Sequence, residues 1–256
     1  MNFTHNYHTH TYRCGHASGT EREYIEQAIE RGLTTLGFSD HVPMIFPSGY
    51  TSTFRCPPEK LGDYIETLTA LREEYRGRIE ILIGFEVEYY PALFDSLLEM
   101  LSPYSYDYFI MGQHFVGNEE GEIYNSHPFE DEAKLKQYVD QVIEGMRTGR
   151  FTYLAHPDVI GFVGDGAIYR KHILRLCEEL KRLDIPLEFN LLGFEESRIY
   201  PSERFFSIAA EVGNDVVIGC DAHHCRNVAE PNIIRSATEL LGRWGITPIE
   251  SVKLRK

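Results

Sequence analysis

The sequence predicts an α/β fold in which a parallel β-sheet closes, or nearly closes, into a barrel. Strand-like runs alternate with amphipathic helical segments seven times along the 256 residues, with no break in composition between them. Runs such as ILIGF (81–85) and VVIG (216–219) are apolar throughout, as is typical of parallel strands covered on both faces. Because (β/α) barrels of this length are usually one domain, we expect a single domain over residues 1–256.

Seven strands are expected from short apolar runs rich in β-branched and aromatic residues. Their ranges are 3–9, 34–40, 79–88, 106–114, 151–156, 186–192 and 215–222. The helices between them show apolar residues three and four positions apart. Thr20 and Glu23 form a capping-box pair before the first helix, and Pro57–Pro58 and Pro91 suit the starts of the next two. The remaining helices follow the stripes at 135–146, 173–180 and 205–212, and a last one begins at Pro231.

Composition excludes several classes of partner. Lys plus Arg number 25 against 39 Asp plus Glu, and the formal net charge of −14 argues against a nucleic-acid-binding surface. Five cysteines at irregular spacing do not form a disulfide framework. The chain shows no signal-peptide pattern and no apolar run of about 18 residues. A soluble, cytoplasmic protein without a membrane partner is therefore expected.

Histidines are concentrated where the predicted strands end. The chain opens on HNYHTHTYRCGHAS (5–18), and seven of the eleven histidines, with two carboxylates, follow the ends of six strands. One histidine alone is more often structural, but scattered structural histidines have no reason to share one end of a barrel. This end carries the active sites of barrel enzymes. The nine candidate ligands are His8, His10, His16, His41, Glu86, His114, His156, Asp221 and His223.

The donor types narrow the choice of metal. Imidazole and carboxylate without paired cysteines suit Zn, Fe or Mn. Nine ligands exceed the three or four protein ligands of one catalytic ion, so two or three divalent ions are expected, with at least one carboxylate shared. Residues 42–57 and 115–130 are the longest irregular segments, and either could cover such a site as a lid.

An ordered set of motifs carries a resemblance to a known family. HTHT, CGHA, SDHVP, GFEVEYY, GQHF, AHPD and GCDAHH together resemble the polymerase and histidinol phosphatase (PHP) superfamily, and more narrowly its monofunctional histidinol-phosphate phosphatases. The resemblance runs from residue 8 to about the final helix. It implies a distorted (β/α)7 barrel with a trinuclear metal centre. The implied ligand sets are His8, His10, Glu86 and Asp221; Glu86, His114 and His156; and His16, His41 and His223.

The resemblance implies a phosphoric monoester hydrolase of histidine biosynthesis. L-histidinol phosphate would be hydrolysed to L-histidinol and phosphate, with a hydroxide shared by two ions attacking phosphorus in line. Arg198, after the sixth strand, is placed to bind the phosphate, unless it only pairs with Glu195 or Glu196, and Arg13 is a weaker candidate. His224 is a further substrate-side candidate. The acidic residues Glu119, Glu120 and Glu122 could receive the substrate amine.

Three alternatives remain open at this point. The same centre could act on another small phosphate ester, such as a nucleotide, a sugar phosphate or phosphotyrosine. Metal-dependent C–N hydrolysis is disfavoured, because amidohydrolase-like barrels typically use a carbamylated lysine and no Lys ends a predicted strand. A non-catalytic metal-binding module is the third, and a turnover assay with added Mn²⁺ or Zn²⁺ separates it from the enzymes.

Overall fold

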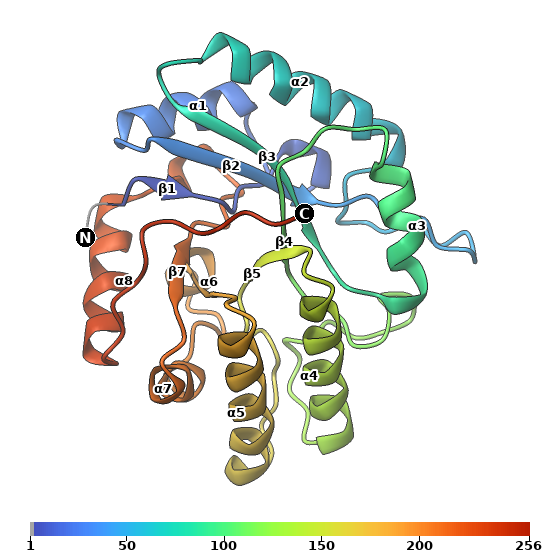
Figure 1. Ribbon diagram of the computed structural model, residues 1–256, viewed down its shortest axis with the longest axis vertical. Coiled ribbons are helices and arrows are strands. Elements are labelled where there is room, and N and C mark those ends of the chain that lie inside the picture. The colour runs from blue at the N-terminus through green and yellow to red at the C-terminus, as the bar shows by residue number, and fades with distance from the viewer. Residues whose placement is uncertain (1–2) are drawn as a thin grey trace.

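The computed structural model of the protein describes residues 3–256 and contains a seven-stranded sheet in the order β1 to β7 (Figure 1). All neighbouring strands are parallel. The predicted seven-stranded α/β barrel is therefore confirmed. The strands are β1 (His5–Asn6), β2 (Thr35–His41), β3 (Glu80–Val87), β4 (Tyr108–Met111), β5 (Phe151–Leu154), β6 (Leu187–Asn190) and β7 (Val216–Gly219).

The two edge strands of the sheet meet beyond their C-terminal ends. Thr9 and Ala222 form an isolated parallel bridge. The His10 N–H donates to the Ala222 carbonyl over 3.0 Å, and the Ala222 N–H donates to the His8 carbonyl over 3.3 Å. Because this bridge lies within HTH and DAH, closing the barrel also brings the first and last histidine motifs side by side.

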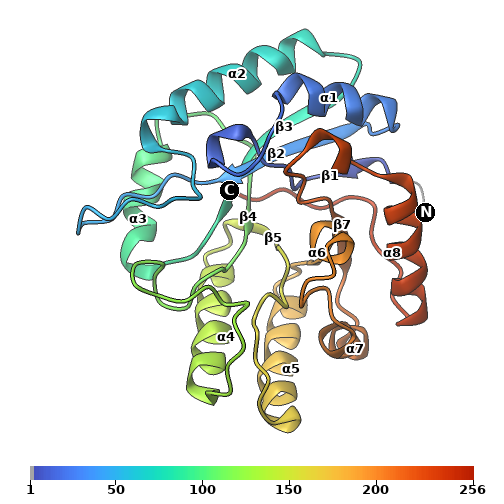
Figure 2. The same ribbon diagram turned by 180° about the vertical axis from the view of Figure 1, so that it is seen from behind.

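Helices surround the sheet, as the views from both sides show (Figures 1 and 2). They are α1 (Glu21–Glu30), α2 (Leu61–Glu74), α3 (Pro91–Leu101), α4 (Glu132–Arg147), α5 (Gly166–Arg182), α6 (Leu191–Glu195), α7 (Glu203–Val212) and α8 (Pro231–Arg243). The capping box of Thr20 and Glu23 is present at α1. Pro91 and Pro231 open α3 and α8, whereas Pro58 opens a short 3₁₀ turn that leads into α2. None of the helices described within residues 3–256 is long and apolar enough to cross a membrane.

The structure ends five of the predicted strands two or three residues early, namely β1, β4, β5, β6 and β7. The sixth ends at Asn190, whose side chain accepts a hydrogen bond from the Gly193 N–H and caps α6, a helix that was not predicted. The fourth ends at Met111, so His114 comes from the loop after β4 and not from the strand itself. In the sixth strand, Leu191 and Leu192 continue the apolar residues past the last ladder hydrogen bond, so hydrophobic periodicity alone does not locate the end of the strand.

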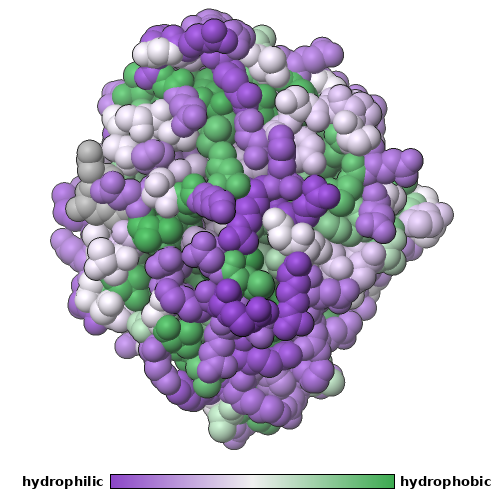
Figure 3. Space-filling view, viewed as in Figure 1, coloured by the Kyte–Doolittle hydropathy of each residue, from purple (hydrophilic) through white to green (hydrophobic). Residues whose placement is uncertain are grey.

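The C-terminal tail closes the opposite end of the barrel. Apolar residues inside the barrel, including Tyr7, Tyr108 and Tyr153, pack against tail residues 249–254. The Ile249 N–H donates to the Val216 carbonyl over 2.8 Å. Hydrophilic side chains gather near the centre of the face that the tail crosses (Figures 1 and 3). The tail therefore covers one mouth of the barrel, at the end opposite to the histidine motifs.

Candidate metal centre

Glu86, at the end of β3, lies at the centre of the nine predicted ligands. Its side chain is buried, and its two oxygens lie 2.8 to 3.6 Å from ring nitrogens of five histidines. These are His8, His10, His41, His114 and His156. The parallel strands β1 to β5 thus bring side chains from four motifs onto the carboxylate of a fifth.

Asp221 and His223, which follow β7, complete the cluster. Asp221 Oδ1 lies 3.1 Å from His10 Nε2 and 3.4 Å from His8 Nε2. His223 Nε2 lies 3.0 Å from Nε2 of His16, the most exposed of the nine. The structure therefore brings all nine predicted side chains together. The groups whose donor atoms lie within 4.8 Å of one another include His16, His41 and His223; His8, His10 and Asp221; and His8, Glu86 and His156.

The donor atoms fit divalent cations. Glu86 Oε2 and His41 Nδ1 are buried and 3.0 Å apart, yet within the described chain neither makes a hydrogen bond. The Nε2 atoms of His8 and His10 also face each other at 3.1 Å. Buried polar atoms without partners are costly, and imidazole and carboxylate donors aimed at a common space are what Zn, Fe or Mn ions satisfy. The cluster is therefore suited to bind divalent metal ions.

Burial and charge set the protonation of the cluster before metal binds. Burial lowers the pKa of His8, but Glu188, Asp221 and Glu86 outweigh it and raise that pKa to about 10. Burial lowers the pKa of His41 to about 4. The surrounding histidines hold the pKa of both Glu86 and Asp221 well below the usual carboxyl range. The metal-free centre thus contains ionised carboxylates, a protonated His8 and a neutral His41.

Metal binding is therefore expected to release protons and to strengthen with pH. A cation displaces the proton that His8 holds below about pH 10, whereas His41 is neutral and has none to give. Between about pH 6 and pH 8, affinity should rise about tenfold per pH unit for each proton released. Titration calorimetry of Zn²⁺ binding in buffers of different ionisation enthalpy counts these protons. A count of zero would contradict the protonated state of His8.

A set of carboxylates behind the histidines was not predicted from the sequence. Glu188 Oε1 lies 2.8 Å from His8 Nδ1, and its other oxygen accepts the His156 backbone N–H over 2.9 Å. Glu88 Oε1 lies 2.6 Å from His114 Nδ1. A carboxylate on Nδ1 fixes the ring and leaves Nε2 for a metal. The sequence does contain a signal for Glu88. Side chains alternate along a strand, so Glu88, two residues after Glu86, shares its side of the predicted strand.

A cavity of about 220 Å³ opens over the cluster and is lined by seven of the nine predicted ligands and by five other side chains. Arg198, predicted to bind phosphate, is in its wall. Its Nη1 donates to the Tyr200 hydroxyl over 2.8 Å and its Nε donates to Glu196 over 2.8 Å. The two alternatives predicted for Arg198, a salt bridge with Glu196 and a position in the substrate pocket, are therefore both present. The five lining side chains outside the predicted ligands are Tyr124, Leu192, Glu196, Arg198 and Tyr200. Of these, only Arg198 was predicted as a substrate-binding residue.

Arg13 and His224 do not line this cavity. The buried guanidinium of Arg13 pairs with Glu21 and Asp63, which ties the N-terminal loop to α1 and α2. The His224 ring accepts the Arg226 N–H over 3.1 Å and caps a 3₁₀ turn. The structure directs both side chains to contacts outside the cavity and does not support their predicted contact with substrate.

The acidic loop is likewise engaged away from the cavity. Glu119 is buried and pairs with Arg55, and Glu120 accepts a hydrogen bond from Ser48 over 2.8 Å. None of Glu119, Glu120 and Glu122 lines the cavity. Apart from predicted ligands, its lining includes one carboxylate, Glu196, in the segment after α6.

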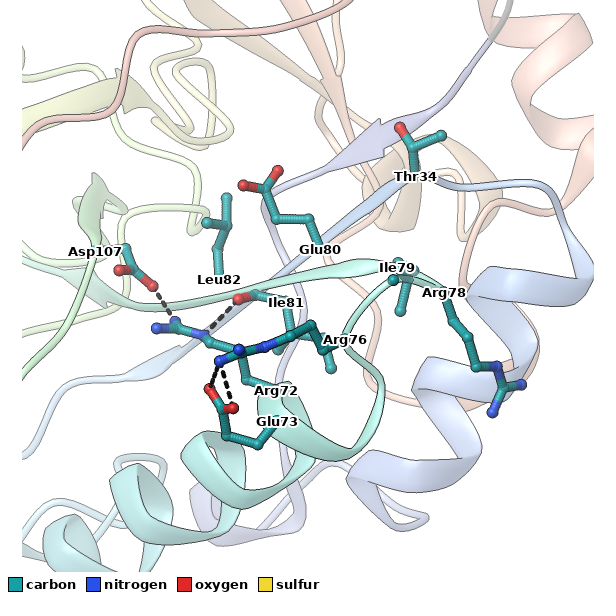
Figure 4. A pocket seen from close by; sticks show the side chains of 11 residues that line it. Thr34, Arg72, Glu73, Arg76, Arg78, Ile79, Glu80, Ile81, Leu82 and Asp107 are labelled. Atoms are coloured by element: carbon teal, nitrogen blue, oxygen red, sulfur yellow. Dashed lines mark hydrogen bonds and ion pairs between the residues drawn. The ribbon is translucent and has the colours of Figure 1, made fainter.

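A larger cavity of about 560 Å³ lies near the start of β3, at the other end of the barrel (Figure 4). Its cationic side chains are already paired. Arg72 donates to Asp107 and to the Ile81 carbonyl, and Arg76 donates to Glu73. Among residues 3–256, no histidine lines it. The chemistry of the sequence motifs therefore belongs to the smaller cavity.

Comparison with known proteins agrees with this geometry. The chain is 31% identical over 225 residues to a probable histidinol-phosphatase of Deinococcus radiodurans, covering 84% of this chain and 85% of that protein. It is 25% identical to the histidinol-phosphatase of Bacillus subtilis, covering 86% and 94% of the two chains.

The fold is also similar to a solved structure. The histidinol phosphate phosphatase of Lactococcus lactis, complexed with zinc, L-histidinol and phosphate, superposes with a TM-score of 0.73 at 18% identity, over 98% of this chain and 99% of the other. At this identity the likeness concerns the fold. A model of the PHP domain matches residues 6–191, the range that contains seven of the nine predicted ligands. With that match over most of its length and a relative above 30% identity, this chain belongs to the PHP domain family.

Proposed function

We propose that this protein is a metal-dependent histidinol-phosphatase, which hydrolyses L-histidinol phosphate to L-histidinol and phosphate. The names of its relatives, which it matches over 84% and 86% of its length, support this substrate. The observation that carries the proposal is the position of Glu86. This one carboxylate is surrounded by five histidines on the floor of a cavity whose wall contains Arg198.

The proposed ligand sets follow the contacts of the cluster. Glu86 would be shared between two sets, which requires at least two divalent ions. Zn, Fe and Mn all suit the donors. We assign His8, His10, Glu86 and Asp221 to one ion, Glu86, His114 and His156 to a second, and His16, His41 and His223 to a third.

When bound, the ions would lower the pKa of water to supply the nucleophile and would neutralise phosphate charge. The chain itself provides the wall that orients the ester. Arg198 offers a guanidinium fork to phosphate oxygens, held by Tyr200 and Glu196. Burial raises the pKa of both Tyr124 and Tyr200, so their hydroxyls stay protonated and can donate to the phosphate.

Glu196 is expected to select for the substrate amine, because it is the cavity carboxylate outside the ligand sets. Glu196→Gln should raise KM for histidinol phosphate about tenfold, since a charge-assisted hydrogen bond at a half-exposed site is worth about 1–1.5 kcal/mol. KM for a phosphate ester without an amine should stay nearly constant. Steady-state kinetics on both esters measure this.

Glu195→Gln is the matched control, because Glu195 accepts a hydrogen bond from Asn227 and does not line the cavity. Equal rises in KM for both esters in Glu196→Gln would mean that Glu196 acts only by holding Arg198.

The proposed function is tested by kcat/KM of the metal-reconstituted protein on L-histidinol phosphate beside a nucleotide, a sugar phosphate and phosphotyrosine. We expect histidinol phosphate to be preferred by about a hundredfold or more, as polar contacts to a substrate group can achieve. Equal rates across the panel would make the protein a phosphatase for another small ester. No turnover with either Zn²⁺ or Mn²⁺ would refute the enzymatic proposal.

A further inference from the structure

Arg55 is a buried cation that belongs to neither the proposed ligands nor the cavity wall. It lies in the loop between β2 and α2 and is 4% exposed. Its guanidinium stacks over the Phe54 ring, 4.8 Å from the ring centroid. A buried charge is costly unless it is paired, so its partners indicate what it is held there to do.

The first partner connects Arg55 to a proposed metal ligand. Arg55 Nη1 donates to Glu88 Oε2 over 2.5 Å. The other oxygen of Glu88 lies 2.6 Å from His114 Nδ1. Glu88 is fully buried, and Arg55 is its cationic partner. Two contacts through one carboxylate therefore join the guanidinium to the ring of His114.

The second partner connects Arg55 to the other long loop. Arg55 Nε donates to Glu119 Oε2 over 2.7 Å, and Glu119 is also buried. The loop that contains Glu119 supplies Tyr124 to the cavity wall, where its ring stacks on that of His114 at 5.3 Å between centroids. Arg55, which belongs to one long loop, therefore contacts the other through Glu119 and the proposed ligand His114 through Glu88.

The neighbour of Arg55 packs on the same ligands. The ring of Phe54 lies edge-on to His41, 5.1 Å between centroids, and 6.2 Å from His114. Without the guanidinium, Glu88 would be a buried anion lacking its counter-charge, and the His114 ring would lose its fixed acceptor. Glu119 would lose its partner at the same time, which would free the loop that holds Tyr124.

We propose that Arg55 is a positioning residue of the metal centre, which acts through Glu88 to aim His114 Nε2 at the ion shared with Glu86. Through Glu119 it also couples the orientation of the His114 ring to the position of the 115–130 loop. This inference rests on the proposed ligand set but does not depend on which phosphate ester is the substrate.

The test compares Zn²⁺ affinity, by competition with a chelating dye, in Arg55→Met, Arg55→Lys and the control Arg72→Met. Arg72 also pairs with a carboxylate, Asp107, but lies by the cavity at the other end of the barrel. Arg55→Met should weaken one ion about tenfold or more, as substitutions behind a ligand do, and leave the other sites unchanged. Arg55→Lys should recover part of this loss, and Arg72→Met should bind zinc like the parent protein.

The absorption spectrum of the Co²⁺-substituted protein gives a second readout, because it reports the geometry of the ligands. A changed spectrum is expected in Arg55→Met and not in Arg72→Met. Unchanged affinity in Arg55→Met, or an equal loss in both, would overturn the proposal. If Arg55→Met does not fold, the zinc affinities of Arg55→Lys and Arg72→Lys are compared instead. A loss in Arg55→Lys alone then supports the proposal, and equal affinities overturn it. If the parent protein binds zinc but does not hydrolyse histidinol phosphate, these affinities still test the role of Arg55.

Discussion

Glu86→Gln is expected to lower kcat for histidinol phosphate by about a thousandfold while the barrel stays folded. Glutamine has nearly the same size, so the packing of this fully buried position is kept. It carries no charge, however, and replaces one acceptor oxygen by an NH₂ group that only donates. Five histidine rings face the two oxygens of Glu86, so an ion shared between them would lose a ligand and its counter-charge together.

Three measurements check this prediction: kcat, the number of ions bound per chain by elemental analysis, and the midpoint of thermal unfolding. Glu80→Gln is the matched control, because Glu80 lies on the same strand, is exposed, and accepts a hydrogen bond from Thr35 at the end away from the cluster. Wild-type kcat in Glu86→Gln, with normal metal content, would show that no shared carboxylate is needed.

The fold could be predicted because its signals are local and repeated. Apolar strands alternating with amphipathic helices leave a parallel sheet as the simplest arrangement, and the element order confirms it. The exact strand boundaries could not be predicted, for a physical reason. In PLEFNLLGF (186–194) apolar residues occur on both sides of Asn190, and only the Asn190 cap separates β6 from α6.

The location of the cluster could also be predicted, because parallel strands bring their C-terminal ends to one mouth of a barrel. That rule places His41 and Glu86 side by side although they are far apart in the sequence, and their strands pair in register at these two residues. The rule does not describe loops. Tyr124 and Tyr200 reach the cavity from irregular segments, and no spacing in the sequence marks them.

The charged residues behind the cluster show a second limit. Arg13 lies between two histidine motifs, yet it pairs with Asp63, 50 residues away on α2, and does not reach the cavity. Arg55 shows the reverse, since nothing in its own loop points to a metal centre. Which buried carboxylate meets which buried cation depends on tertiary packing, and the sequence lists the charges without pairing them.

Gly112→Ala is expected to reduce metal binding and to lower kcat about a hundredfold, as a ligand displaced by about 1 Å would. Gly112 directly follows β4, and a Cβ atom there would overlap Glu86 Oε1. Its φ is not in the left-handed region, so alanine meets no backbone strain, and the conflict is with the carboxylate. Glu86 would have to swing away from His114 and His156, the two rings nearest to that oxygen.

Gly242→Ala on α8 is the control, because no described atom beyond its chain neighbours and its own helix backbone lies within 4 Å of the added methyl group, and alanine favours a helix. It should keep full activity and gain slightly in thermal stability. Gly219→Ala offers an independent comparison, since its Cβ would overlap Glu188, the carboxylate behind His8. If Gly112→Ala keeps both its ions and its rate, the Glu86 carboxylate can move without loss, and the centre does not depend on the position seen here. If Gly112→Ala and Gly219→Ala both lose metal, the positions of Glu86 and Glu188 each depend on a neighbouring residue that has no side chain.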